Sequence, residues 1–200
     1  MQFQKDDIRE KILAAAEETF LKQGFGKASM REIAKKAGIS TSNMYNYFKS
    51  KAELFYTIAD PVFHHLANVR KEIFEYKANK DFNSENFMQQ FTEFVPKVIF
   101  EMIRKYRIEL LLVMDCSKGT KYEQLKKMMT TAMEANFTDN IISKKKKILL
   151  QDSFLMHILA MNLLEGLLEI TRNYKNDEWA KNNIESLMKY HIRGMVQFFT

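Results

Sequence analysis

Residues 29–51 have the sequence SMREIAKKAGISTSNMYNYFKSK, and this stretch decides how the N-terminal part of the chain folds. It opens with Ser29 and Glu32, which have the three-residue spacing of a capping box at the start of a helix. Gly38 follows soon after, and glycine readily takes the left-handed conformation that ends a helix. We therefore expect a short helix between these signals and a tight turn directly after it.

A second helix start and an upstream amphipathic segment complete a three-helix arrangement. Ser50 and Glu53 repeat the capping spacing, so residues 41–48 must form another short helix before them. Upstream, apolar residues recur at helical spacing over about residues 6–23, and Gly24 ends that pattern. The apolar faces predict one compact core, made of Ile8, Ile12, Ala16, Phe20, Ile33, Ala34, Ala37, Ile39, Met44 and Phe48.

The helix expected after the turn keeps a polar face without any acidic residue. This face consists of Thr41, Ser42, Asn43, Tyr45, Asn46, Tyr47 and Lys49. A helix of this kind, held by a partner helix across a glycine-containing turn, has the form that enters the major groove of DNA. Short hydroxyl and amide groups can approach base edges, and tyrosines and lysines can reach phosphates. Residues 1–51 also carry ten Lys or Arg against six Asp or Glu, which suits a polyanionic partner.

Several pieces of this segment occur together in a fixed order and spacing. They are Ile12–Ala16, Phe20, Gly24-Phe25, Ser29–Ala34, Gly38–Ser40 and Tyr45–Lys51. Together they strongly resemble the N-terminal signature of the TetR/AcrR family of transcriptional regulators. The resemblance covers about residues 8–55, roughly a quarter of the chain, and implies a helix-turn-helix DNA-binding domain.

Carried over residue by residue, the resemblance implies two kinds of DNA contact. Arg31, Thr41, Ser42 and Asn43 are expected to contact bases or the nearby backbone. Tyr45, Tyr47 and Lys51 look like phosphate contacts. Lys51 lies in the first turn of the next helix, where free backbone N–H groups favour a phosphate. The alternatives are packing of the two tyrosines under the helix and a merely solvated Arg31.

The remainder of the chain, residues 52–200, has no such signature and is predicted to be a helical effector-binding and dimerisation domain. The whole sequence contains only six glycines and two prolines, and apolar residues recur at helical spacing nearly throughout. We therefore predict an all-α fold, in which a three-helix domain over residues 1–51 precedes a helical bundle. Helices are expected near 51–77, 84–105, 106–116, 120–139, 148–174 and 177–198, with kinks or breaks at Pro61 and Pro96.

The last two long helices are predicted to form a homodimer interface. Residues 148–170 are apolar around most of the helix circumference, and the final helix is amphipathic. Together they can supply half of a four-helix interface, as the resemblance also implies. A two-fold dimer would require a roughly palindromic operator in double-stranded DNA. A membrane span is not expected, because His157, Asn162, Glu165 and Glu169 interrupt the apolar stretch.

Binding of a small, partly apolar effector is a further implication of the resemblance. The second region is rich in Phe, Met and Tyr, which can line an adaptable cavity but can equally be ordinary core. The polar candidates, each in or beside an apolar run, are Tyr106, Cys116, His157, Asn162 and Glu165. For His157 a satisfied core position is the alternative, and for Asn162 and Glu165 a solvated or interface position. No cofactor or metal site is expected, since the adjacent His64 and His65 point to different faces.

Two remaining features bear on location and on nonspecific binding. Cys116 is the only cysteine, so no disulfide can form within the chain, and the N-terminus lacks the apolar run of a secretory signal. We therefore expect a cytoplasmic protein. The run Lys144–Lys147 is interpreted as a solvated loop rather than a nucleic-acid or lipid contact.

The sequence thus predicts a ligand-responsive, dimeric transcriptional repressor. Three alternatives stay open at this point. The chain could be an activator, or a DNA-binding dimer without an effector, which a closed regulatory core would favour. It could also be a small helical enzyme, although the sequence contains no Gly-rich phosphate loop, no His-Glu-x-x-His and no Gly-x-Ser-x-Gly.

Overall fold

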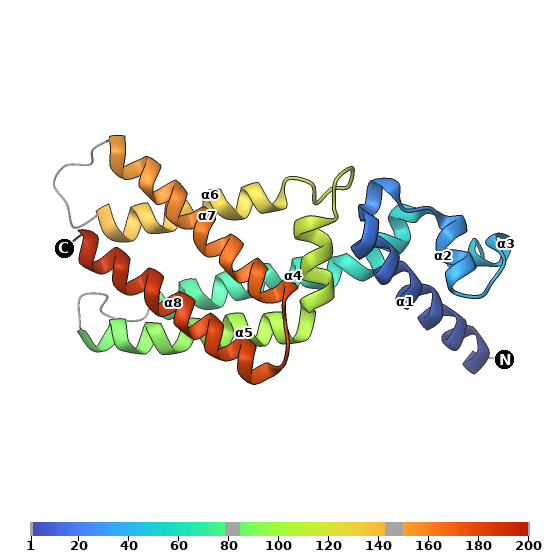
Figure 1. Ribbon diagram of the computed structural model, residues 1–200, viewed down its shortest axis with the longest axis horizontal. Helices are drawn as coiled ribbons and strands as arrows, with labels where there is room; N and C mark the ends of the chain where they lie inside the picture. The colour runs from blue at the N-terminus through green and yellow to red at the C-terminus, as the bar shows by residue number, and fades with distance from the viewer. Residues whose placement is uncertain (1, 79–84, 143–149, 200) are drawn as a thin grey trace. The chain divides into compact units, whose positions relative to one another are not determined.

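The computed structural model describes residues 2–78, 85–142 and 150–199. Over these ranges the regular secondary structure is entirely α-helical, with eight helices and no strand, so the predicted fold class is confirmed (Figure 1). The helices are α1 (Gln2–Lys27), α2 (Met30–Lys36), α3 (Thr41–Met44), α4 (Lys51–Ala78), α5 (Glu85–Asp115), α6 (Leu125–Ile142), α7 (Leu150–Arg172) and α8 (Asp177–Phe199). The run Lys144–Lys147, which was predicted to be a solvated loop, lies outside the described residues.

The predicted signals bound α2 and interrupt α1, but α1 itself extends beyond the predicted residues 6–23 at both ends. Gly24 interrupts α1 with φ 76° and ψ 163°, and Gly38 follows α2 with φ 71°. Ser29 caps α2, because its Oγ accepts a hydrogen bond from the backbone N–H of Glu32 at 3.2 Å. The Glu32 carboxylate accepts a bond from Gln23 Nε2 at 2.8 Å. The side chain of Glu32 thus ties α2 to the end of α1.

The third helix is shorter than the sequence predicted. Ser40 caps it by accepting a bond from the N–H of Asn43, but α3 ends at Met44 rather than residue 48. The N–H groups of Tyr47 and Phe48 both donate to the carbonyl of Met44, at 3.0 and 3.1 Å. This shared acceptor closes the chain into a turn that delivers it to α4.

The start of α4 carries the second predicted pair of capping residues. Ser50 Oγ accepts a bond from the N–H of Glu53 at 3.0 Å. The Glu53 carboxylate reaches back to the N–H of Lys49 at 2.7 Å, one residue before the position that an ideal capping box would use. Two backbone donors that α4 cannot satisfy internally are therefore bonded.

The later helices follow the predicted order, with two differences: two predicted helices are joined into one, and the two prolines do not end their helices. The segments expected as 84–105 and 106–116 form a single helix, α5, whose backbone departs from helical dihedrals at Tyr106 (φ −125°, ψ 31°). Pro61 and Pro96 lie inside α4 and α5, which continue past them. The break in α5 therefore falls at Tyr106 and not at the proline.

Packing divides the chain into two compact units. The first comprises the residues up to Leu66 together with Tyr106–Leu125, and the second comprises Ala67–Lys105 together with the residues from Lys126 onward. The unit that contains the three N-terminal helices thus extends beyond residue 51. A functional boundary at residue 51 stays a prediction.

The first unit has a core built around aromatic side chains. Phe20 of α1 and Phe55 of α4 are buried, and their ring centroids lie 5.1 Å apart in an edge-on arrangement. The ring centroid of Phe25, in the last turn of α1 beyond Gly24, lies 5.2 Å from that of Phe55. Of the predicted core, Ile8, Ala37 and Ile39 are only half-buried. The predicted residues that are buried are Ile12, Ala16, Phe20, Ile33, Ala34, Met44 and Phe48.

The end of α5 and the turns after it also belong to this first unit. The backbone N–H of Phe25 donates to the carbonyl of Cys116 at 2.9 Å. Asp60 of α4 accepts a bond from the Tyr122 hydroxyl at 2.5 Å and pairs with Lys121 at 2.9 Å. Partial burial alone would raise the pKa of Asp60, but the bonds from Tyr122 and Lys121 hold it below its ordinary value.

In the second unit, α7 and α8 pack side by side (Figure 1). Gly166 permits their close approach, because a Cβ atom there would lie 2.9 Å from a methyl carbon of Leu187. The segment Phe154–Arg172 is long and apolar enough to cross a membrane, with a mean hydropathy of 1.4. Its Glu165, however, forms ion pairs with Lys126 at 2.6 Å and Arg172 at 2.5 Å. These charges favour the predicted helix of a soluble domain.

Replacing Gly38 by alanine tests the turn between α2 and α3. An L-residue in the left-handed conformation costs about 1–2 kcal/mol, so Gly38→Ala should lower the free energy of unfolding by about that amount in a urea titration. Gly26→Ala is the matched control, because Gly26 has no positive φ and no atom near its missing Cβ. An equal loss of stability in both variants would contradict this account of the turn.

Candidate nucleic-acid interface

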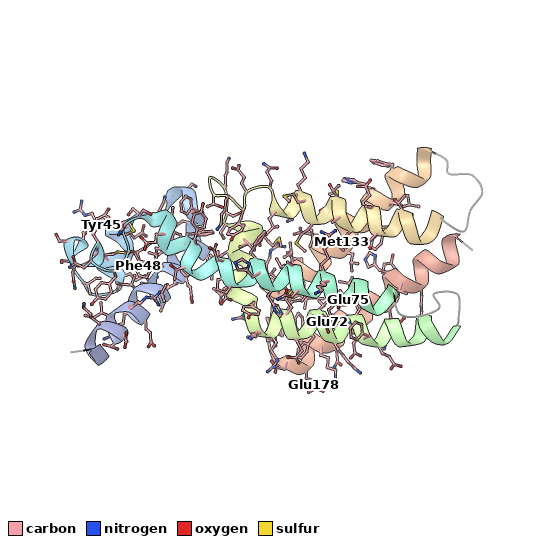
Figure 2. All side chains as sticks on the ribbon, turned by 180° about the vertical axis from the view of Figure 1, so that it is seen from behind. Tyr45, Phe48, Glu72, Glu75, Met133 and Glu178 are labelled. Atoms are coloured by element: carbon pink, nitrogen blue, oxygen red, sulfur yellow. The ribbon has the colours of Figure 1, made fainter. Side chains whose placement is uncertain are left out.

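The turn 41–48 presents polar side chains outward over a buried apolar base. Met44 and Phe48 are fully or almost fully buried, whereas Ser42, Asn46 and Lys49 are exposed. We call the polar set the recognition face; it consists of Thr41, Ser42, Asn43, Tyr45, Asn46, Tyr47 and Lys49. Figure 2 shows Tyr45 on the outer side of this turn and Phe48 on its inner side.

The individual positions of the recognition face differ in how freely they can reach a partner. Tyr45 is 51% exposed, which argues against the alternative that it packs beneath the helix. Tyr47 is half-buried, as are Thr41 and Asn43, and this exposure is compatible with either role for the tyrosine. Asn46, which the sequence prediction had not assigned to DNA, donates from Nδ2 to Asn43 Oδ1 at 3.3 Å.

Arg31 and Lys51 lie outside this face, and their surroundings differ. Arg31 is exposed on the first turn of α2. Lys51 is half-buried, and its Nζ donates to the carbonyl oxygens of Phe25 at 2.6 Å, Ala28 at 2.8 Å and Gly26 at 3.3 Å. A direct phosphate contact by Lys51 stays a prediction, and a phosphate would have to compete with these carbonyls.

The predicted effector residues divide between the two compact units. Tyr106 and Cys116 belong to the first unit, and His157, Asn162 and Glu165 belong to the second. The Tyr106 ring lies 4.7 Å from the ring of His65. Cys116 is buried, and burial raises the pKa of its thiol, which makes it a weak nucleophile. Neither residue shares a packing unit with the other three candidates.

In the second unit the three remaining candidates have different environments. His157 of α7 contacts the Glu134 carboxylate of α6 through Nδ1 at 3.0 Å, and both side chains are part-exposed. Asn162 is exposed, and Glu165 is held by Lys126 and Arg172. Their assignment to an effector stays a prediction. Among the described residues no group of three or more His, Cys, Asp or Glu side chains is arranged to hold a metal ion.

Sequence reasoning missed His191, which lies on the buried face of α8. The side chain is 4% exposed, and its Nδ1 atom has no hydrogen-bond partner among the described residues. Burial lowers the pKa of His191, so the neutral ring is favoured. Its spacing from Ile184 and Met188, both buried, places a polar ring on the apolar stripe of α8. A histidine at helical spacing within an apolar stripe was the sequence signal that could have identified this buried position.

The N-terminal motif is similar to a known family of proteins. Residues 12–58 match the family model described as bacterial regulatory proteins, tetR family. The chain is 41% identical over 54 residues to the transcriptional activator FasR of Mycolicibacterium smegmatis, covering 27% of this chain and 25% of FasR. It is 38% identical over 52 residues to the transcriptional repressor BepR of Brucella suis, covering 26% of this chain and 28% of BepR. The chain thus matches only about a quarter of the length of either relative.

Solved structures resemble the chain over nearly its whole length. A TetR-family transcriptional regulator from Bordetella parapertussis has a TM-score of 0.63 at 15% identity, covering 92% of this chain and 93% of its own. A TetR-like transcriptional regulator from Rhodococcus sp. RHA1 has a TM-score of 0.57 at 18% identity, covering 94% and 96%. At these identities the similarity shows a shared fold.

His191 should make the stability of the protein depend on pH. Since its folded-state pKa is lowered, the unfolded chain binds a proton at a higher pH than the folded chain does. Stability should therefore fall as the pH drops below about 6.5, the ordinary histidine pKa. In His191→Leu the melting temperature should change less between about pH 7 and pH 5 than it does in the wild-type protein. His64→Gln, a change at an exposed histidine, should keep the wild-type pH dependence. An unchanged pH profile in His191→Leu would contradict this assignment.

Proposed function

We propose that the chain is a TetR-family regulator, as the match of residues 12–58 supports, and that it acts as a homodimeric repressor released from a palindromic operator by a small molecule. The observation that carries the proposal is the recognition face, a polar surface without acidic residues, supported from beneath by buried Met44 and Phe48. A short capped helix with this character fits the major groove. The match of residues 12–58 to a family of regulatory proteins favours a DNA-binding regulator over the enzyme alternative.

The DNA contacts follow from the reach and chemistry of each side chain. Thr41, Ser42 and Asn43 are proposed to approach base edges or the adjacent backbone, with Asn43 able to bond a base in bidentate fashion. Arg31 is proposed to assist them from α2, where its exposure leaves the guanidinium accessible. The hydroxyl groups of Tyr45 and Tyr47 are proposed to bind phosphates, and so is the ammonium group of Lys51 in the first turn of α4. In this proposal residues 1–51 bind DNA, and residues 52–200 regulate and dimerise.

Dimerisation is proposed to use α7 and α8. The two helices pack against each other, and α7 still leaves Phe154 and Met161 exposed, at 67% and 47%. These residues stand seven positions apart and therefore share one face of the helix. Tyr190 of α8 is also exposed. A two-fold partner would cover this apolar surface and pair two recognition faces for an inverted repeat.

Effector binding is the part of the proposal with the least direct support. Phe, Met and Tyr are abundant in the second unit, and the unpartnered Nδ1 of buried His191 is a polar atom that a ligand could satisfy. Effector and operator would then weaken each other's binding by the same factor. The alternative is an effector-independent DNA-binding regulator.

The direction of regulation does not follow from the DNA-binding domain. The matched relatives include an activator and a repressor with similar identity over this region. We propose repression because occupying an operator is sufficient to block transcription, whereas activation requires a further surface for the transcription machinery. The cytoplasm, where bacterial DNA lies, is the proposed location.

Selection of bound duplexes from a random DNA pool tests sequence reading directly. The wild-type dimer should recover an inverted repeat at a stated salt concentration. Asn43→Ala should change which bases are preferred within each half-site, while Tyr45→Phe should weaken binding to all sequences without changing the preference. Recovery of no preferred sequence by the wild-type protein would contradict a sequence-specific regulator.

Sedimentation measurements test the proposed dimer interface. Met161→Lys should shift the protein from dimer to monomer, because it places a charge in the apolar surface that the partner covers. Met128→Lys is the matched control, since Met128 is 63% exposed on α6, outside the proposed interface. A Met161→Lys protein that remains dimeric would place the interface elsewhere.

A further inference from the structure

Arg9 of α1 contacts the ring of Phe48, the last residue of the turn 41–48. Its guanidinium carbon lies 5.4 Å from the centroid of the Phe48 ring, although the two residues are far apart in the sequence. Phe48 itself is buried, whereas Arg9 is exposed, and so is Lys49, the first residue after the turn. The positive charge of Arg9 therefore lies at the margin of the recognition face, on a different helix.

Arg9 keeps both its charge and its hydrogen-bond donors available. A guanidinium group has five N–H donors and no acceptor. In the part of the chain that the structure describes, these donors have no carboxylate or carbonyl partner. The next basic residue of α1, Lys11, differs, because its Nζ pairs with Asp7 at 2.8 Å. Of these two cations, Arg9 alone has no anion among the described residues.

The Phe48 ring orients Arg9 without neutralising it. A cation is attracted to the face of an aromatic ring, and arginine makes this contact more often than lysine. The ring carries no net charge, so the contact leaves the positive charge of the guanidinium unbalanced. It also restricts the side chain before any partner arrives, which reduces the entropy that a later contact costs. Arg9 is thus held in place as a cation that an anion from outside the chain can approach.

The position of Arg9 favours a phosphate over a base as that anion. A helix in the major groove has a sugar–phosphate strand on either side, and contacts to phosphates fix the orientation of the protein. The candidates for base reading, residues 41–43, belong to α3, while Arg9 reaches the margin of the same face from α1. A guanidinium group can bind a phosphate through two parallel hydrogen bonds.

We propose that Arg9 is a further DNA contact of this chain, which binds a backbone phosphate beside the half-site that the recognition face reads. The contact extends the nucleic-acid interface onto the first helix, outside residues 12–58 that match the family model. Phe48 then has two roles, because it supports the recognition face from beneath and orients the phosphate-binding group. The inference rests on the proposed DNA-binding function.

The salt dependence of DNA binding tests this contact. Each lost phosphate contact should reduce the slope of log affinity against log salt by about 0.9, so Arg9→Met should reduce it by about 1.8 in a dimer that loses two. Lys11→Met is the matched control, because it removes the same charge from the opposite side of α1, where the lysine already pairs with Asp7. The control should keep the wild-type slope. An unchanged slope in Arg9→Met, or an equal reduction in both variants, would overturn the proposal.

Base preference separates a phosphate contact from base reading. Arg9→Met should select the same inverted repeat from a random DNA pool as the wild-type protein, with weaker binding to every sequence. Arg9→Lys keeps the charge and should therefore keep the wild-type slope. A changed base preference in Arg9→Met would assign Arg9 to a base and contradict the phosphate contact.

A purely structural role for Arg9 predicts a different result. If the guanidinium only covered Phe48, Arg9→Met would lower the melting temperature of the DNA-free protein and leave the salt slope unchanged, which would contradict the proposal. The wild-type side chain can also be observed directly, in case the variant fails to fold. In nitrogen-15 labelled protein, the Arg9 Nε–H signal should shift when the selected duplex is added, or a random-sequence duplex if selection recovers none. The signal of Arg104, whose Nε donates to Glu101, should stay in place. An Arg9 signal that does not move would overturn the contact.

These measurements also separate failure of the inference from failure of the proposed function. Sequence-specific binding by the wild-type protein, together with an unchanged slope in Arg9→Met, would support the regulator and contradict the Arg9 contact. Binding without any sequence preference, together with a reduced slope in Arg9→Met, would support the contact and contradict the sequence-specific regulator. Binding of no duplex at all would contradict both.

Discussion

Burial of Met44 and Phe48 determines which side of the turn 41–48 remains available to DNA. Each side chain is removed from water almost completely, and burial of one such side chain contributes about 1.5–3 kcal/mol. Because α3 has a single turn, its own hydrogen bonds could not keep it helical or oriented. The recognition face is therefore positioned by its apolar underside, which packs with the core of the first unit, and by the caps at Ser40 and Ser50.

Local sequence was sufficient to predict the elements that depend on local chemistry. The caps at Ser29 and Ser50 and the left-handed glycines at 24 and 38 all act within a few residues of themselves. The partners of Glu32 and Glu53 were less predictable, because each carboxylate had several nearby donors to choose from. The carboxylate of Glu32 accepts a hydrogen bond from Gln23 of α1, and that of Glu53 accepts one from the N–H of Lys49. The predicted end of α3 was also wrong. The N–H groups of Tyr47 and Phe48 share the carbonyl of Met44, and the local sequence does not indicate such a shared acceptor.

Contacts between distant segments were beyond the reach of a single sequence. Nothing near Cys116 indicates that its carbonyl bonds Phe25, or that Tyr122 bonds Asp60. These contacts join the end of α5 to the unit that carries the recognition face, so the first unit is larger than the family motif. The effector candidates stay a prediction for the same reason. They were chosen for polarity beside apolar runs, a criterion that does not indicate which of them pack in the same unit.

Lys51 shows why a family motif can preserve a residue type without specifying its task. A cation at the start of α4 can bind a phosphate brought by DNA, or it can bind carbonyl oxygens brought by the protein. Both partners present oxygen atoms with negative charge, and either one satisfies the ammonium group. In this chain Nζ of Lys51 donates to three carbonyls that follow the break in α1 at Gly24, those of Phe25, Gly26 and Ala28. Gly24 lies 27 residues before the lysine, so only the folded chain shows that the segment after the glycine contacts Lys51.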